Sequence, residues 1–356
     1  MTMSANRPSQ TEPKPSPANP PVGRFLLVTA SVFAILIGCA WLWALKGRMW
    51  FLDAEYGMWS ATQEMTRTCA HGDVVMLGDS RAKAGLVPSV MGSKVTNFAL
   101  GGGSPIEAYY LVERMLQCPT PPKHVIVSFS AMYFSFVDVY WARSALFGFL
   151  SFAELEEVRR LSVDLRDPLI YSMSKAKRPF YALKNLSYAT GMPSYYFPAM
   201  INARFFMRKK TNDDVMRTTI RNRGHTFFGT AESAEWLVEY LKAFRVSPIM
   251  HHYFSAMVQR LLEKDARIWF VGMPLNKTTY DAFGPSVRDD FLAYLQRFSA
   301  KDGRFRVVGE VLPWLTRENF GDGEHLNPKG AIAWSKRVRS ELALNGVEGG
   351  TVPERE

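Results

Sequence analysis

The sequence is poor in cysteine, with three in 356 residues, and no Cys/His spacing in it is typical of a zinc site. Long runs of one charge are also missing: the net charge of +10 is spread along the chain, in groups no larger than Arg208-Lys209-Lys210. No nucleic-acid-binding motif accompanies this charge. We therefore expect no metal and no nucleic-acid partner, and interpret the basic balance as that of a protein beside an anionic membrane or glycan.

Signatures of nucleotide cofactors are absent as well. Gly101-Gly102-Gly103 lacks the Lys-Ser/Thr of a phosphate-binding loop and does not match a dinucleotide fingerprint. His251 and His252 fall in a predicted helix, where successive side chains point about 100° apart and cannot both face one metal. No cofactor is therefore predicted.

The N-terminal region contains the one long apolar run of the chain. Residues 1–23 are rich in Pro, Ser, Asn and Thr, which predicts a disordered tail. Residues 25–45 are almost continuously apolar and uncharged, and about 20 such residues cross a bilayer as a helix. With Arg24 before the run and Lys46 after it, the pattern predicts a transmembrane anchor over 24–48.

Two alternatives to a retained anchor are open. A cleaved signal peptide is disfavoured, because the tail before the run is long and no Ala-x-Ala site follows it. Leu36-Ile37-Gly38-Cys39 resembles a bacterial lipobox, but the residues after Cys39 stay apolar, where a lipoprotein normally turns polar.

The two other cysteines bear on topology, since the flanking charges decide little. Cys69 and Cys118 each precede a predicted strand by a few residues. If those strands are parallel neighbours, both cysteines lie at the same sheet edge and a disulfide is plausible; two unrelated buried thiols are the alternative. A disulfide would place the domain outside the cytoplasm.

From residue 74 the chain alternates apolar segments with helical patterns, which is typical of a parallel α/β sheet. Near-continuous Val, Ile and Phe runs indicate strands buried on both faces. Five strands are predicted, at 74–78, 95–98, 124–129, 267–273 and 305–309.

The predicted organisation is a connecting helix over 49–73, an α/β domain over 74–346 and a polar tail over 347–356. The stretch 131–262 departs from the alternation and is interpreted as a large helical insertion. Helical segments within it are predicted at 141–150, 153–165 and 231–244.

Two helices of the α/β domain have readable ends. Ser104-Pro105-Ile106-Glu107 is a capping box with Pro at the first helical position. Asn327-Pro328 opens the last helix, which is predicted to end near Asn345-Gly346.

Chemically useful residues follow the predicted strands. Ser80 comes just after the first strand, Gly102 after the second, and Asp322 and His325 after the last. Ligands of parallel sheets sit at the carboxyl ends of the strands, so these residues are expected to share one edge. Serine, aspartate and histidine supply a nucleophile, an orienting acid and a base.

These motifs resemble those of the GDSL, or SGNH, hydrolase superfamily. The first block matches Gly78-Asp79-Ser80, with Arg81 in place of Leu, and the last block matches Asp322 and His325. The second block matches Asn97 and Gly102, with Ala99 in place of its first glycine. The resemblance covers roughly residues 74–130 and 265–340.

The resemblance implies a flavodoxin-like three-layer α/β/α fold and a reaction. Ser80 would attack an acyl carbonyl, His325 would take its proton, and Asp322 would hold the histidine tautomer. The backbone N–H groups of Ser80 and Gly102 would form the oxyanion hole.

The third family block departs from its pattern, because Met132 stands where the family has an oxyanion-donating Asn. Losing one such donor typically costs about 10²–10³ in rate. The methionine would make the pocket more apolar, and aromatic residues of the insertion are candidates to roof it (Tyr133, Phe134, Phe136, Tyr140 and Trp141).

Three further residues are candidate substrate contacts. Ser130 follows the third strand, and Asn276 follows the fourth. His225 lies in a basic loop over 221–225, which is interpreted either as an anionic-glycan contact or as a solvated turn.

The chain is similar to membrane-anchored SGNH-like proteins that O-acetylate extracytoplasmic polysaccharides, or that assist D-alanine transfer to teichoic acids. This resemblance implies a single-pass protein of the bacterial inner membrane with a periplasmic domain. It also implies a polysaccharide or acyl-ester substrate and a multi-spanning membrane acyltransferase as partner. A carbohydrate or lipid esterase and a non-catalytic polysaccharide-binding assembly factor are the alternatives.

Overall fold

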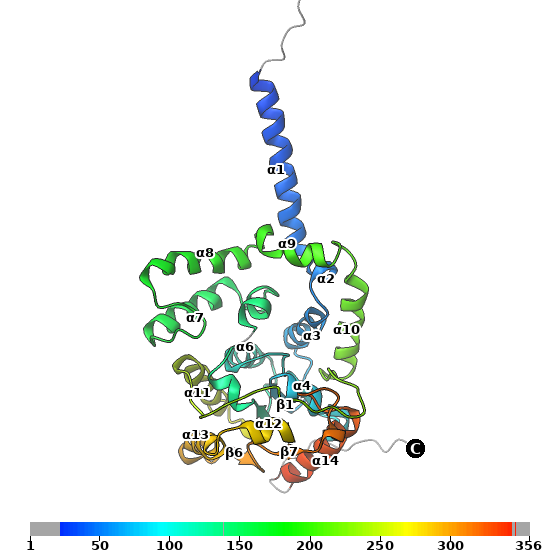
Figure 1. Cartoon of the computed structure of the whole chain (residues 1–356), viewed down its shortest axis with the longest axis vertical. Coiled ribbons are helices and arrows are strands. Elements are labelled where there is room, and N and C mark those ends of the chain that lie inside the picture. The colour runs from blue at the N-terminus through cyan, green and yellow to red at the C-terminus, as the bar shows by residue number, and fades with distance from the viewer. Residues whose placement is uncertain (1–21, 138, 344–345, 347–356) are drawn as a thin grey trace, which may run out of the picture.

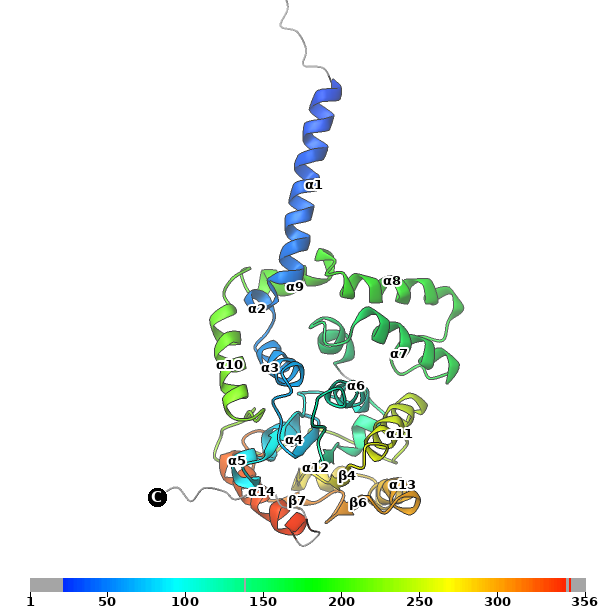
Figure 2. The same cartoon turned by 180° about the vertical axis from the view of Figure 1, so that it is seen from behind.

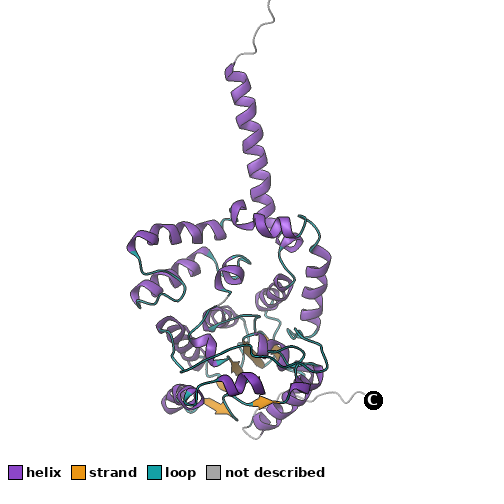
Figure 3. Ribbon diagram, in the orientation of Figure 1, coloured by secondary structure: helices purple, strands orange, loops and turns teal. Residues whose placement is uncertain are grey.

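The computed structural model describes residues 22–137, 139–343 and 346, so most of the predicted N-terminal tail and the whole of 347–356 lie outside the described residues. One long N-terminal helix projects from an α/β body, and the strands gather at the end of the body remote from that helix (Figures 1 and 3).

The helices and strands have the following bounds. The strands are β1 Val74–Gly78, β2 Val95–Asn97, β3 His124–Ser128, β4 Arg267–Val271, β5 Leu275–Asn276, β6 Phe305–Val308 and β7 Trp314–Leu315. The α-helices up to β4 are α1 Val22–Lys46, α2 Arg48–Phe51, α3 Glu55–Arg67, α4 Ser80–Gly85, α5 Pro88–Met91, α6 Pro105–Met115, α7 Phe152–Asp164, α8 Arg178–Ala189, α9 Pro193–Asn202, α10 Lys209–Arg221 and α11 Pro248–Leu262. The later ones are α12 Lys277–Ala282, α13 Val287–Lys301 and α14 Pro328–Ala343.

The five predicted strands form one fully parallel sheet in the order β2-β1-β3-β4-β6. This is the order of flavodoxin-like doubly wound sheets, and the order reverses between β1 and β3. Ligands of such sheets bind at that reversal, outside the carboxyl ends of the strands. A second parallel pair, β5 with β7, was not predicted.

Successive side chains of each strand point to opposite faces of the sheet, and both faces are buried, as the apolar runs predicted. Val75, Leu77 and Val125 belong to the core that α6, α11 and α13 share. Val74 and Met76 belong to the core on the α14 side. Helices therefore cover both faces of the sheet (Figure 2).

Local sequence signals place the flanking helices. Ser104 and Glu107 form the predicted capping box at the start of α6. Pro328 begins α14, also as predicted, and the helix reaches Ala343; residues 344–345 lie outside the described part.

The insertion is helical over much of its length, but one of its predicted helices does not form. The prediction over 153–165 is confirmed by α7, while 140–145 forms a single π-helical turn. The helix predicted over 231–244 is wrong, because this segment is irregular. Its polar groups bond to distant elements instead: Ala234 N donates to Arg317 O and Val238 N to Thr279 Oγ1.

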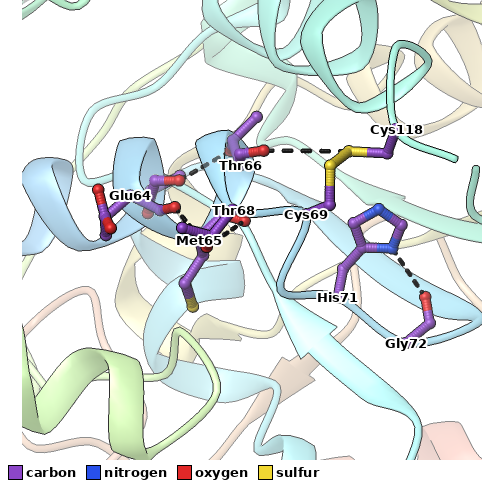
Figure 4. Close-up of a disulfide and its surroundings, with 9 residues drawn as sticks. Glu64, Met65, Thr66, Thr68, Cys69, His71, Gly72 and Cys118 are labelled. Atoms are coloured by element: carbon purple, nitrogen blue, oxygen red, sulfur yellow. Dashed lines mark hydrogen bonds between the residues drawn. A yellow bond between two sulfur atoms is a disulfide. The ribbon is translucent and has the colours of Figure 1, made fainter.

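The predicted connecting helix is two helices, α2 and α3, with a break after Leu52. A disulfide joins Cys69, just after α3, to Cys118, just after α6, with the two Cα atoms 5.8 Å apart (Figure 4). The pairing predicted from the strand positions is therefore present.

Helix α1 is 25 residues long, and an 18-residue window in it has a mean hydropathy of 2.4 with none of its surface buried in the body. It is long and apolar enough to span a membrane, or to act as a signal sequence. Cys39 lies exposed within this continuous helix.

Candidate active site

The Ser80 turn is built at the carboxyl end of β1, beside the reversal of strand order. A Cβ at Gly78 would lie 2.0 Å from Ser128 O, so the close approach of β1 to β3 requires glycine there. Asp79 caps α4 by accepting from Arg81 N at 2.9 Å and Ala82 N at 3.4 Å. Ser80 thereby becomes the first residue of α4, and it is largely buried.

Asp322 and His325 form a hydrogen-bonded pair. His325 Nδ1 donates to Asp322 Oδ2 at 2.9 Å, and Asp322 Oδ1 accepts from the backbone N–H of Glu324 and of His325. Burial opposes ionisation of Asp322, but the hydrogen bonds from His325 and these N–H groups outweigh it and lower the pKa of the carboxyl. The pair can therefore hold one histidine tautomer, with the proton on Nδ1.

The other ring nitrogen of His325 is buried and has no hydrogen-bond partner among the described residues. Phe228 stacks on the imidazole with ring centroids 4.6 Å apart. An unpartnered ring nitrogen of this kind is available to accept a proton from a hydroxyl group.

Gly102 follows β2 and adopts a φ of +67°, a conformation that favours glycine. A Cβ at this position would also lie 2.4 Å from Val139 Cγ2. In the part of the chain that the structure describes, the backbone N–H groups of Ser80 and Gly102 make no hydrogen bond. Both are thus free to donate to an incoming oxygen.

Ser80 and His325 occupy the same edge of the sheet. Their chain neighbours meet, since Arg81 Nη2 lies 3.8 Å from Glu324 Oε1. No hydrogen bond joins Ser80 Oγ to His325 within the described residues, so a nucleophile–base contact is not formed in this structure. Such contacts are often long in the absence of substrate.

A buried network of polar side chains holds the Ser80 turn in place. Arg81 Nη1 donates to Glu239 Oε1 at 2.6 Å, and Ser130 Oγ donates to both carboxylate oxygens of Glu239. Ser130 N donates to Asp79 Oδ2 at 2.8 Å. Burial raises the pKa of Asp79 to about 6, although Arg81 and the Ser130 N–H act in the opposite direction.

A second carboxylate, that of Glu55 at the start of α3, lies next to Gly101 in the turn that follows β2. Glu55 Oε1 accepts from Arg143 Nη2 at 2.5 Å, whereas Oε2 is buried without a partner among the described residues. A Cβ on Gly101 would meet that Oε2 at 3.1 Å and the Phe228 ring at 3.2 Å. Burial raises the pKa of Glu55, and Arg143 partly offsets this.

The predicted substrate contacts Ser130 and Asn276 have other partners. Ser130 is held by Glu239. Asn276 caps α12, with Oδ1 accepting from Thr279 N, and Nδ2 donates to Trp236 O and Gly323 O. Asn276 therefore positions the loop that carries Asp322 and His325, and has no amide hydrogen left for a substrate.

His225 is not in a solvated basic loop, and both readings of it are corrected. It is buried, and its Nε2 donates to Ala84 O at 2.9 Å. Burial lowers the pKa of His225 to about 4, so the ring is neutral and cannot attract an anionic glycan. Its role is to secure the end of α4.

Two of the five aromatic residues expected over the site, Phe134 and Trp141, lie elsewhere. Phe134 packs in the core among Phe254 and Phe291, and Trp141 stacks on Tyr188 at 5.7 Å. Phe228, from a loop that no motif marked, covers His325 instead.

Four site residues were missed from the sequence: Glu55, Arg143, Phe228 and Glu239. Each reaches the site from a segment distant in the chain, and none stands in a motif. Asn97, by contrast, stood in a motif that could be recognised in the sequence. Its Nδ2 donates to Ala82 O and Leu86 O, which links the end of β2 to α4. Within the described residues, no three His, Cys, Asp or Glu side chains converge as a metal site.

Comparisons with known proteins add little. No family model and no curated protein matches this chain. One solved structure, described as that of "a putative platelet activating factor from Streptococcus pneumonia", aligns over 87% of this chain and 99% of its own, at 9% identity and a TM-score of 0.33. Because identity and TM-score are both so low, nothing is transferred from it.

Proposed function

We propose that this protein is a membrane-anchored serine acyltransferase that O-acetylates an extracytoplasmic polysaccharide through an acyl-serine intermediate. His325 Nε2 takes the proton of Ser80 Oγ as the oxygen attacks the acyl carbonyl. The N–H groups of Ser80 and Gly102 donate to the oxyanion. The protonated imidazole then gives its proton to the leaving group. In the second half, His325 takes the proton of a sugar hydroxyl as that oxygen attacks the acyl-serine, and returns it to Ser80 Oγ as the ester bond to Ser80 breaks.

One observation carries this proposal: His325 is bonded through Nδ1 to Asp322 at 2.9 Å, while Nε2 is buried and has no partner among the described residues. A histidine kept only for structure would be expected to satisfy both nitrogens. The unbonded N–H groups of Ser80 and Gly102 support the same reading.

Glu55 offers a contact for the hydroxyl of an acceptor. Its Oε2 is a buried acceptor without a partner in the described structure, next to Gly101 and the Phe228 ring. A sugar hydroxyl can donate to this oxygen and so be oriented for attack. Phe228 shields the imidazole, which slows attack by water.

Membrane anchoring rests on how α1 meets the body. Its last turns are packed rather than free: Ala44 is fully buried, and Trp41 Nε1 donates to Thr190 O at 2.6 Å. A retained anchor keeps these contacts, whereas cleavage after α1 would lose them. The Cys69–Cys118 disulfide supports a periplasmic domain at the bacterial inner membrane, where a multi-spanning acyltransferase would supply acyl groups.

Acylation of the full-length protein by an activated acetyl ester tests the nucleophile. We expect one acetyl group on Ser80 by mass spectrometry and none in Ser80→Ala. Ser128→Ala is the matched control, because Ser128 is also a buried serine whose Oγ has no partner among the described residues, but it lies within β3. Equal labelling of Ser80→Ala and wild type would refute the assignment.

The acceptor is tested by adding acetylatable polysaccharide to the acetyl-enzyme. We expect slow turnover of nitrophenyl acetate alone, and faster turnover with acetylated glycan as product. Glu55→Gln should weaken glycan-dependent turnover while leaving Ser80 labelling intact. Fast hydrolysis indifferent to glycan would favour an esterase.

The missing hydrogen bond between Ser80 and His325 favours a second candidate, a non-catalytic polysaccharide-binding assembly factor. Glycan binding without any labelling of Ser80 would support this candidate.

A further inference from the structure

Two helices of the insertion lie across the end of α1. Figures 1 and 2 show α8 and α9 roughly perpendicular to α1, at the level where it enters the body. Contacts fix this arrangement: Trp41 Nε1 bonds Thr190 O between the two helices, and Leu45 packs so closely on Gly191 that a Cβ there would lie 2.5 Å from Leu45 Cδ2. If α1 spans a bilayer, α8 and α9 lie at its surface.

The helical layer formed by α8, α9 and residues 203–210, here called the platform, exposes many large apolar side chains. Leu183 is 58% exposed, Ile201 56% and Met207 68%. The others are Phe180, Leu186, Met192, Phe197, Phe205 and Phe206. In a soluble protein a patch of this kind marks an interaction surface.

The opposite side of the platform is packed against the body. Asn185 Nδ2 donates to Leu155 O on α7, and Tyr188 stacks on Trp141. Arg48 Nη2 donates to Tyr196 Oη on α9 at 2.9 Å. The platform is therefore amphipathic: one side belongs to the core, and the other has no cover in the described structure.

The charged residues of this region are all basic, although Lys209 pairs with Asp213 just beyond it and Lys184 lies over the Trp141 ring. Residues 168–212 contain no Asp or Glu. They contain eight basic residues, namely Lys175, Lys177, Arg178, Lys184, Arg204, Arg208, Lys209 and Lys210. Exposed apolar side chains combined with basic ones are the pattern of helices that lie in the interface of an anionic membrane.

We propose that the platform is a second, monotopic membrane contact, in which the exposed faces of α8 and α9 enter the interface of an anionic bilayer. The occupant is lipid, because the apolar patch continues the lipid-exposed surface of α1 and the basic residues complement lipid phosphates. This inference rests on α1 spanning the membrane and not on the reaction proposed for Ser80. Its effect is to fix the tilt of the body, which a single span alone leaves free.

Depth-dependent fluorescence quenching in nanodiscs of anionic lipid tests the proposal on the full chain. Cys39→Ser removes the free thiol of α1, and Leu183→Cys or Ile201→Cys carries an environment-sensitive fluorophore. Ile332→Cys is the matched control: it is also apolar and exposed, but lies on α14, at the end of the molecule remote from α1 (Figure 1). Nitroxide-labelled lipids serve as the quencher.

We expect several-fold stronger lipid quenching at 183 and 201 than at 332, and a decrease when Lys175, Lys177 and Arg178 are replaced by Gln. Quenching at 183 and 201 equal to that at 332 would overturn the proposal. Protection of these two positions from aqueous iodide without lipid quenching would also overturn it, because a second copy of the chain would then cover the platform.

Discussion

The backbone N–H of Ser130 donates to Asp79 Oδ2 over 2.8 Å. This bond crosses the point where strand order reverses, joining the end of β3 to the turn after β1. The segment after β3 thus contributes structure to the Ser80 turn through Ser130, while Met132 offers no polar side chain. Glu239 completes the arrangement by holding both Ser130 and Arg81.

Glu239→Ala should destabilise the protein by about 3–5 kcal/mol, because it leaves the Arg81 charge buried without its main partner. Denaturant unfolding in detergent measures the loss. Arg217→Ala is the control, since the Arg217–Asp214 pair is exposed and should be worth at most about 1 kcal/mol. Replacing both partners, as Arg81→Met with Glu239→Leu, should cost less than Glu239→Ala; a larger loss would contradict the argument.

Lys83 predicts a pH dependence of stability. It is fully buried, its Nζ donates among the described residues only to Thr62 Oγ1 at 3.4 Å, and burial lowers its pKa from 10.5 to about 7. Between these pH values the unfolded chain binds the proton that the folded protein has lost, so stability rises with pH. Across this pH range the free energy of unfolding rises by about 5 kcal/mol.

Lys83→Met should remove this rise, as seen in unfolding free energies measured between pH 7 and pH 10.5. Lys264→Met, at an exposed lysine, is the control and should keep the wild-type slope. An unchanged slope in Lys83→Met would show that the buried amine does not titrate as argued.

The Cys69–Cys118 disulfide closes a loop with a sequence separation of 49, so replacing both cysteines by serine should cost about 4 kcal/mol. Cys39→Ser, at the exposed cysteine of α1, should cost nothing measurable. Reductant should lower the unfolding midpoint of wild type and leave the double variant unaffected. Two free thiols in protein from its native host would contradict a disulfide.

Asn276→Asp should slow acylation of Ser80 by one to two orders of magnitude, the scale set by losing an outer positioning contact. The aspartate still caps α12 by accepting from Thr279 N, but it no longer donates to Gly323 O, and the loop bearing His325 is released. Thr279→Ser is the control, because it keeps both the backbone N–H that the cap needs and the hydroxyl that accepts from Val238 N. A rate equal to wild type would mean that Asn276 is only a helix cap.

Much of the sheet could be predicted because its signals are local. β1 has the predicted bounds, and β3 and β4 begin at the predicted residues, since their consecutive apolar side chains are those of strands buried on both faces. The start of α6 was readable from the reciprocal bonds of Ser104 and Glu107. The segment 231–244 failed because its backbone groups bond to Arg317 and Thr279, and such distant partners override a helical pattern.

The sequence by itself determined which side chains could do chemistry here, because Ser80, Asp322 and His325 stand in short motifs after strands whose ends must share an edge. Only the tertiary structure decided what surrounds them. Glu239 meets Arg81 across 158 residues, Phe228 meets His325 from an irregular loop, and Glu55 reaches Gly101 from the start of α3. No local pattern encodes these contacts, because each depends on the packing of segments far apart in the chain.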